Sequence, residues 1–267
     1  MASKSAAIEK KVLVPTADRE DGRVKAHPGF LGKAAQSAAL TARALQSWRL
    51  YRKHRRNTMT HATAYISNLL LARGVLEVPG CVIECGVWRG GMIAGIAEVL
   101  GPDRDYFLFD SFEGLPKAQR MDGESIAAWQ RDVESPAYFD NCRASEDEAR
   151  AAMRIAGAPR VVTVKGWFDR TLPGFRPPSP IALLRLDGDL YASTKICLES
   201  LYEHVAPKGL IVIDDYGTWE GCARAVNEFL ARTSEHQVLR LRQYANRVFY
   251  IVKEEGVQGN DLSVMRS

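Results

Sequence analysis

The 267-residue sequence lacks the short motifs that mark several large enzyme classes. It contains no GxSxG nucleophile elbow, no GxxxxGK(S/T) phosphate loop and no GxGxxG dinucleotide turn. Its five histidines form no HxxxH or HExxH pair, which argues against a zinc site. No apolar run reaches the roughly 18 residues that a membrane-spanning helix needs. These absences argue against the corresponding hydrolases, P-loop proteins and dinucleotide enzymes, and against a membrane-spanning helix.

The sequence contains few cysteines, and their number is odd. The five cysteines are Cys81, Cys85, Cys142, Cys197 and Cys222. They are scattered through predicted strands and helices, which favours reduced thiols and a cytoplasmic location over a disulfide framework. The first eleven residues hold four charges and no apolar stretch, so we predict no secretory signal.

Basic residues are concentrated at the start of the chain. Residues 1–60 hold 13 Lys and Arg against 4 Asp and Glu, whereas the remainder holds 23 basic and 28 acidic residues. We predict a basic, partly helical extension over residues 1–57, loose in residues 1–30, and a separate domain over residues 58–267.

The extension contains a predicted helix at 31–57 with an apolar side that includes Leu40, Leu45 and Trp48. Such a helix can contact a membrane surface, a nucleic acid or an acidic partner. It can also pack on its own domain or on a second subunit, which is the interpretation we favour. We therefore expect no nucleic-acid partner, and peripheral membrane contact stays open.

Short apolar runs alternate with helical segments beyond residue 80. The runs predict strands at Cys81–Cys85, Tyr106–Phe109, Val161–Val164, Ile181–Leu186, Leu210–Ile213, Val238–Leu241 and Val248–Val252. Helices are predicted at Thr60–Arg73 with Gly74 as the C-cap, and at Gly91–Leu100, Ser145–Ile155, Thr194–His204 and Glu220–Arg232.

This alternation implies an α/β fold with a parallel sheet covered on both faces. The last two strands have no helix between them, so they predict an antiparallel terminal hairpin. Seven strands ending in such a hairpin are the outline of a Rossmann-like class I methyltransferase. Residues 114–144 lack clear periodicity and are predicted to form an active-site lid.

A glycine-rich turn follows the first predicted strand. It reads Glu84-Cys85-Gly86-Val87-Trp88-Arg89-Gly90-Gly91, and its glycines allow a sharp turn and a close approach to a ligand. The spacing disfavours a pyrophosphate, and the acidic residue before the first glycine suits a ligand with an amine or hydroxyls. The alternative is a strand-to-helix turn without a ligand.

Asp110 ends the second predicted strand, where doubly wound folds place a carboxylate that binds ribose hydroxyls. Ser111 follows it and is a second candidate contact. The alternative for Asp110 is a helix N-cap. Trp167 follows the third strand, where it can stack on an adenine or pack in the core or lid.

Carboxylates follow two adjacent predicted strands. Asp187 and Asp189 come after the fourth strand, and Asp214 and Asp215 after the fifth. Carboxylates so close repel one another unless they are protonated or bridged by a cation, and oxygen ligands suit Mg²⁺. We predict a metal site at Asp187, Asp214 and Asp215. The alternative is that these residues cap helices and pair with Arg185, Lys195 or Arg224.

Five blocks in order resemble the macrocin-type O-methyltransferases, which methylate sugar hydroxyls of natural products. The blocks are VPGCVIECGVWRGG, FDSFEGLP, KGWFDRTLP, LRLDGDLYAST and GLIVIDDY, within a resemblance from about Thr58 to Val252. The resemblance implies S-adenosylmethionine and Mg²⁺ as cofactors and a homo-oligomer, either a dimer or a tetramer, in which the N-terminal helices are candidate interface elements. Its pattern falls on Glu84, Gly86 and Gly90 for the methionine end, Asp110 for the ribose, and Asp187, Asp214 and Asp215 for the metal.

The implied reaction is attack of an acceptor oxygen on the sulfonium methyl group. The metal would lower the effective pKa of the acceptor hydroxyl, and a carboxylate would take its proton. Asp189 is the candidate base, with Asp187 as the competing choice. The acceptor is expected to be a sugar of a natural product or of a glycan.

Two other functions compete with this one. A catechol-type O-methyltransferase would use the same cofactor and metal on an aromatic diol, but that class generally has a Lys shortly after the first metal-binding Asp. The next lysine after Asp187 is Lys195. A degenerate binding module tethered through the basic extension would usually have lost glycines or metal-binding acids, and none is lost here.

Overall fold

The computed structural model describes residues 28–233, 239–245 and 248–254. The chain forms two compact units, residues 1–41 and residues 42–267. The described part of the first unit, residues 28–41, is helical and begins α1 (Pro28–His54), which continues into the second unit. Most of the segment predicted to be loose lies outside the described residues. The predicted boundary after residue 57 stays a prediction, and residues 42–57 are part of the second unit.

A seven-stranded sheet forms the centre of the second unit, in the order β3-β2-β1-β4-β5-β7-β6. The strands are β1 (Cys81–Cys85), β2 (Tyr106–Asp110), β3 (Val161–Lys165), β4 (Ile181–Leu186), β5 (Val205–Ile213), β6 (Arg242–Tyr244) and β7 (Val248–Val252). β1 to β5 pair in parallel, whereas β7 pairs antiparallel with both β5 and β6. The predicted mostly parallel sheet with an antiparallel terminal hairpin is confirmed.

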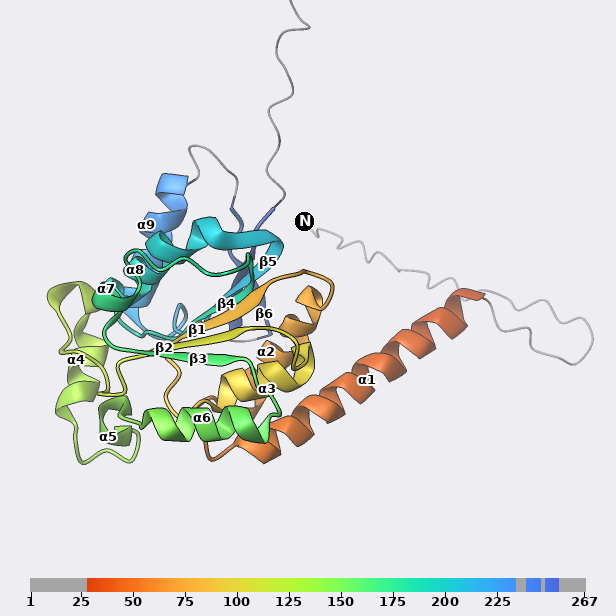
Figure 1. Ribbon diagram of the computed structural model, residues 1–267, viewed down its shortest axis with the longest axis horizontal. Helices are drawn as coiled ribbons and strands as arrows, with labels where there is room; N and C mark the ends of the chain where they lie inside the picture. Colours follow the sequence, from red (N-terminus) through yellow and green to blue (C-terminus); the bar gives the residue numbers. More distant parts are fainter. Residues whose placement is uncertain (1–27, 234–238, 246–247, 255–267) are drawn as a thin grey trace, which may run out of the picture. The chain divides into compact units, whose positions relative to one another are not determined.

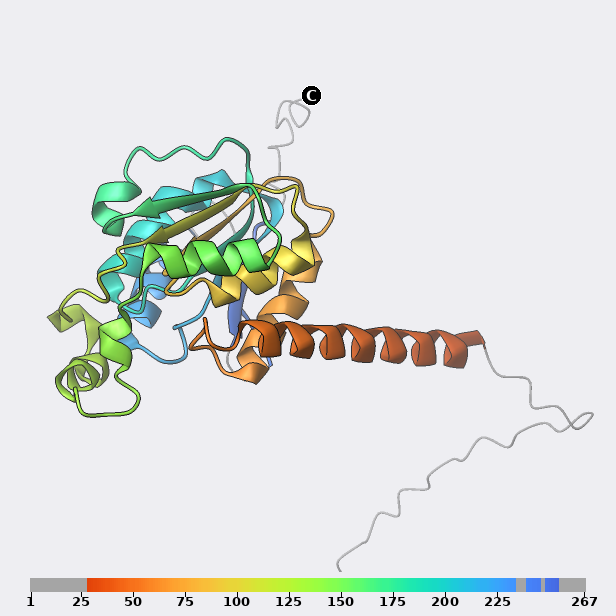
Figure 2. The same ribbon diagram turned by 60° about the horizontal axis from the view of Figure 1, so that its bottom comes forward.

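Helices cover both faces of this sheet (Figure 1). α2 (Ala62–Ala72), α3 (Gly91–Leu100) and α6 (Glu146–Ile155) lie on one face, and Figure 2 shows α3 and α6 side by side across it. α8 (Tyr191–Leu201) and α9 (Glu220–Thr233) cover the other face. Burial on both sides explains why the central strands read as continuous apolar runs.

Side chains of β1 alternate between two apolar clusters. Val82 packs in the cluster on the α3 side, and Ile83 in the cluster on the α8 side. β2 follows the same alternation, and β4 does so from Leu183 onward, after a register irregularity near its start, so these central strands also contribute to both halves of the core. The carboxyl ends of β1, β2, β4 and β5 are thereby held side by side at one edge.

Three predicted boundaries are wrong. Gly74 does not cap α2, because the helix passes directly into a 3₁₀ turn, η1 (Arg73–Val75), that buries Val75. β5 begins at Val205 rather than Leu210, since a register irregularity lets it pair past Pro207. The sixth strand is β6, not residues 238–241. Residue 238 lies outside the described residues, and the edge strand's register is set by β7 instead of by an apolar run.

The segment 114–144 contains helical turns that its sequence did not predict. η2 (Arg120–Asp122) and α4 (Glu124–Arg131) are followed by α5 (Phe139–Cys142), whose four residues all have φ between 50° and 60°. α5 is therefore a left-handed turn, a conformation disfavoured for L-residues other than glycine. Two further short helices are α7 (Phe168–Thr171) and η3 (Tyr202–His204). Within the described residues, no helix is long and apolar enough to cross a membrane.

Candidate active site

The glycines between β1 and α3 are required by close backbone packing. Gly86 has φ 87°, and a Cβ added there would lie 1.7 Å from the carbonyl oxygen of Asp187. Gly90 has φ 77°, and its Cβ would lie 2.9 Å from the Cα of Ala149 in α6. Gly86 lines the cavity described below, whereas Gly90 is not among its lining residues. Helix packing alone thus accounts for Gly90.

Replacing Gly86 by Ala is expected to lower the free energy of unfolding by roughly 2 kcal/mol or more, because left-handed strain adds to the clash with Asp187. Gly74→Ala is the matched control, since nothing lies within 4 Å of a Cβ at that position. Urea unfolding of both variants checks the difference. Equal stability of the two variants would contradict the close approach of the two loops.

Asp110 ties the end of β2 to the glycine turn. Its Oδ2 accepts hydrogen bonds from the backbone N–H groups of Val87 and Trp88 at 2.7 and 2.8 Å, and its Oδ1 accepts one from Phe112 at 2.7 Å. Ser111 is buried, and its hydroxyl donates to the Gly114 carbonyl at 3.0 Å. Both residues line the cavity, but these hydrogen bonds serve the two loops that form its wall.

Arg185 is the centre of a buried ionic network. It sits on β4 directly opposite Glu84 of β1, and its Nη1 donates to Glu84 Oε1 at 2.8 Å. The same Nη1 donates to Asp187 Oδ2 at 2.7 Å, and Nη2 lies 2.6 Å from Asp214 Oδ1. Arg185 and Glu84 are each 1% exposed. Among the described residues, Arg185 is the only buried Arg or Lys, so it alone opposes these carboxylates from within the core.

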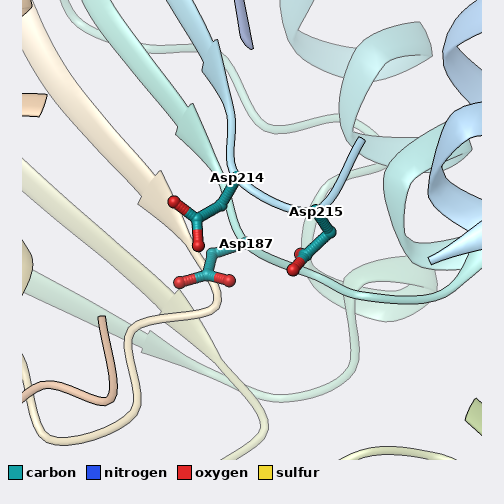
Figure 3. A group of neighbouring side chains, drawn as sticks. All are labelled: Asp187, Asp214 and Asp215. Atoms are coloured by element: carbon teal, nitrogen blue, oxygen red, sulfur yellow. The ribbon is translucent and has the colours of Figure 1, made fainter. Parts of the chain in front are cut away.

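Asp187, Asp214 and Asp215 converge at the carboxyl ends of β4 and β5 (Figure 3). One carboxylate oxygen from each lies within 4.8 Å of the others. Arg185 pairs with one oxygen of Asp187 and one of Asp214, and Asp215 Oδ2 accepts from the backbone N–H of Asp189 at 3.0 Å. Each of the three carboxylates therefore keeps a second oxygen for which the described residues provide no hydrogen bond.

The ion pairs foreseen as the alternative to a metal do form at Arg185, but they use only part of the carboxylate oxygens. The carboxylate oxygens that remain without a hydrogen bond are hard, anionic donors, which is the type of ligand that Mg²⁺ prefers. The residues present thus fit a divalent cation at this position.

Asp189 lies beside this group without belonging to it. It adopts a left-handed backbone conformation, with φ 57°, and its Oδ1 accepts a hydrogen bond from Trp219 Nε1 at 2.8 Å. Burial, followed by the charge of Asp187, raises the pKa of Asp189 to about 8. A carboxyl group with a pKa near neutrality is suited to exchanging protons.

Acidic side chains outnumber basic ones among the residues that line the site. Burial raises the pKa of Glu84 to about 8 and that of Asp214 to about 6, and it also raises the pKa of Asp215. In addition, Glu84 Oε2 is buried and has no hydrogen-bond partner among the described residues. An unpartnered buried carboxylate oxygen fits a cationic donor such as the ammonium group of a methionine moiety.

A cavity of about 760 Å³ adjoins these groups, which is within the range of pockets that hold cofactor-sized ligands. The predicted site residues that line it are Glu84, Gly86, Asp110, Ser111, Trp167, Asp187, Asp189, Asp214 and Asp215. Trp167, at the start of α7, is 36% exposed at the cavity wall. The structure therefore brings together every predicted site residue except Gly90.

Aromatic side chains from the segment 114–144 close the side of the cavity near the carboxylates. Trp129 and Phe139 line it together with Trp219, and the ring centroids of Trp129 and Trp219 are 6.4 Å apart. No sequence motif contains Trp129, and Trp219 lies three residues after the block GLIVIDDY, so that block is the one signal that points to either tryptophan.

One polar residue of this segment fixes it to the domain, and another joins its two ends. Asp122 is buried, and its Oδ1 accepts from the backbone N–H of Tyr191, the first residue of α8, at 2.7 Å. Asn141 donates to the Leu115 carbonyl at 2.8 Å, and its own carbonyl accepts from the Leu115 N–H at 2.9 Å. The bond of Asp122 places the segment relative to α8 and the loop before it, which carries Asp187 and Asp189.

The sheet order and the site at its carboxyl edge define a Rossmann-like class I methyltransferase. The macrocin-O-methyltransferase (TylF) family matches residues 55–242, and the chain belongs to this family. It is an S-adenosylmethionine-dependent O-methyltransferase.

Three similar proteins support this assignment. The chain is 33% identical over 218 residues to the 8-demethyl-8-(2,3-dimethoxy-alpha-L-rhamnosyl)-tetracenomycin-C 4'-O-methyltransferase of Streptomyces olivaceus, covering 79% of this chain and 76% of that protein. It is 36% identical to the demethyldecarbamoylnovobiocin O-methyltransferase of Streptomyces niveus over 58% of this chain and 60% of that protein. The structure of the O-methyltransferase NovP matches with a TM-score of 0.57 and 32% identity, covering 71% of this chain and 81% of that one.

Proposed function

We propose that this enzyme methylates a hydroxyl group of a sugar moiety, carried by a natural product or a glycan, in a Mg²⁺-dependent reaction. The observation that carries the proposal is the convergence of Asp187, Asp214 and Asp215, each with an oxygen left over by the protein's own hydrogen bonds. The sugar acceptor is supported by the relative from Streptomyces olivaceus, whose name describes a methyl transfer to a rhamnosyl-bearing compound.

The chain's residues suit distinct tasks in this reaction. Glu84, through its unpartnered Oε2, would accept a hydrogen bond from the cofactor's ammonium group, and Asp110 and Trp167 would lie along its nucleoside end. When bound, S-adenosylmethionine supplies an electrophilic methyl group and Mg²⁺ supplies Lewis acidity toward the acceptor hydroxyl. Asp187, Asp214 and Asp215 would hold the ion.

Asp189 is the proposed base. Its Oδ1 is oriented by Trp219, which leaves Oδ2 to take the proton of the acceptor hydroxyl. Asp187 is the competing base, but its Oδ2 is engaged by Arg185 and its other oxygen is assigned to the ion. The wall formed by Trp129, Phe139 and Trp219 would pack against the acceptor and exclude water from the reacting oxygen.

Among the residues that the structure describes, no lysine lines the cavity in the place that the catechol-type alternative generally requires. Lys195, the first lysine after Asp187, lies on α8 and forms an ion pair with Glu199 at 2.8 Å. It is not among the residues that line the cavity. The assigned family also leaves no support for a degenerate binding module.

Acceptor and metal dependence can be tested together. With S-adenosylmethionine and Mg²⁺, we expect methylation of rhamnosylated compounds, no methylation of catechol, and loss of turnover when EDTA is added. Calorimetric titration in EDTA should still show S-adenosylmethionine binding, because the proposed ligands of the ion are separate from Glu84 and Asp110. Full turnover in EDTA would refute the metal dependence, and methylation of catechol in preference to sugars would refute the acceptor class.

A further inference from the structure

The second half of α1 and the turn that follows it carry a surface of unusual charge. From Gly22 to Leu76 the sequence contains no Asp or Glu, although it holds ten Lys and Arg. Within the second unit, Arg49, Arg52, Arg55 and Arg56 are exposed, and none forms an ion pair with a carboxylate that the structure describes. A concentration of unpaired positive charge on one short segment attracts an anionic partner.

Two large apolar side chains accompany these arginines. Leu45, Trp48, Arg49 and Arg52 follow the spacing i, i+3, i+4 and i+7, which places them on one face of the helix. Leu45 is 51% exposed and Trp48 is 43% exposed. We call Leu45, Trp48, Arg49, Arg52, Arg55 and Arg56 the arginine surface.

The opposite side of the same helix is fixed to the domain. Ser47, Leu50 and His54 are buried. His54 Nε2 lies 2.6 Å from Glu98 Oε1, and Lys53 Nζ lies 2.9 Å from the same oxygen. The basic residues that face the domain are thus paired, whereas those of the arginine surface are not. The contacts of the buried side hold the helix on the domain, and they do not involve the side chains of the arginine surface.

We propose that the arginine surface binds an anionic membrane surface. Basic residues beside Trp and Leu on one helix face are the pattern of helices that lie in the membrane interface. The arginines would contact lipid phosphates, while Leu45 and Trp48 would enter the boundary between headgroups and acyl chains. This arrangement needs no membrane-spanning helix.

Two other occupants fit the same residues less well. A second copy meeting this surface about a two-fold axis would set its arginines against the same arginines, without an acidic residue to compensate them. A nucleic acid would neutralise the charge, but phosphate contacts give no role to the exposed Leu45. An anionic lipid surface uses both the charged and the apolar members.

The arginine surface adjoins the cavity along the chain. Asn57, the residue after Arg56, lines the cavity, as do Thr58 and His61. A membrane-bound enzyme would therefore hold its cavity close to acceptors carried on the membrane. The binding itself does not depend on which acceptor is used.

Cosedimentation of the full-length protein with lipid vesicles tests the proposal. At low ionic strength we expect binding to vesicles of equimolar phosphatidylglycerol and phosphatidylcholine, and little binding to phosphatidylcholine alone. Arg49→Gln with Arg52→Gln should lower the partition coefficient about 30-fold, since each basic side chain at an anionic surface contributes about fivefold. Trp48→Ala should also weaken binding.

Arg176→Gln with Arg224→Gln is the matched control, because both arginines are exposed and form no ion pair that the structure describes. It should bind vesicles like the wild type, and all variants should keep their turnover with a water-soluble acceptor. Wild-type binding by the Arg49/Arg52 variant, or equal binding to neutral vesicles, would overturn the proposal. So would a wild-type dimer that binds no vesicles and that Trp48→Ala converts to a monomer in light scattering.

Discussion

Replacing Asp215 by Asn is expected to lower turnover about 1,000-fold or more, because it removes one anionic ligand from the proposed metal site. Among the three carboxylates, Asp215 gives the cleanest test. It makes no ion pair with Arg185, and an Asn side chain can still accept the hydrogen bond from the Asp189 N–H. Calorimetry should show S-adenosylmethionine affinity within a few-fold of the wild type and a large loss of Mg²⁺ affinity.

Asp189→Asn is expected to lower turnover without the loss of Mg²⁺ affinity that is expected for Asp215→Asn. Asn tolerates the left-handed backbone at this position, so the loop should be retained. Turnover should fall at least about 100-fold while Mg²⁺ and S-adenosylmethionine still bind, as expected for loss of a general base.

Asp132→Asn is the control for both, because Asp132 is exposed at the end of α4 and does not line the cavity. Loss of cofactor binding with metal-dependent turnover retained in Asp215→Asn would reverse the assignment of the two sites.

Arg185→Met is expected to lower the free energy of unfolding by about 3–5 kcal/mol near neutral pH. The substitution preserves much of the side-chain volume but leaves Glu84, Asp187 and Asp214 without their buried cation. Removing one partner of a buried ionic network is costly, because the remaining charges are neither solvated nor paired. Urea unfolding, monitored by circular dichroism, measures the change.

A surface pair supplies the matched comparison for this variant. Arg160 binds Asp105 through two hydrogen bonds, of 2.7 and 2.9 Å, but its side chain is 55% exposed. Arg160→Met should therefore cost less than about 1 kcal/mol. If the two variants were equally stable, the network around Arg185 would not be a major source of stability.

The sequence predicts the fold well, because the hydrophobic pattern of a doubly wound sheet is strong. Strands buried on both faces give continuous apolar runs, and the intervening helices have their own periodicity. The hydrophobic pattern fails where tertiary contacts determine an element. β6 is defined by its pairing with β7, and α2 ends in a 3₁₀ turn in which Val75 is buried in the core.

The candidate site likewise has residues that the sequence predicts and residues that it does not. Asp187, Asp214 and Asp215 could be brought together from sequence, since parallel strands deliver their carboxyl ends to one edge. Arg185 was considered only as a possible partner, although an arginine within the apolar run Ile181–Leu186 signals a buried charge that needs several partners.

Asp122 could not be found from sequence, because its bond to Tyr191 joins segments 69 positions apart. Gly90 is the reverse case. Its place in the motif predicts a ligand contact, which stays a prediction, and the close approach of α6 already explains why a side chain is excluded there.

The anchoring of the segment 114–144 has a consequence for how such enzymes diversify. Asp122 near its start is tied to Tyr191 of α8, Asn141 near its end is tied back to Leu115, and Trp129 and Phe139 of the cavity wall lie between these two residues. The segment is thus a loop closed on itself, with one hydrogen bond from Asp122 to the domain. We expect that exchanging the stretch between Asp122 and Asn141 would change the acceptor, while the carboxylates at the strand ends keep their positions.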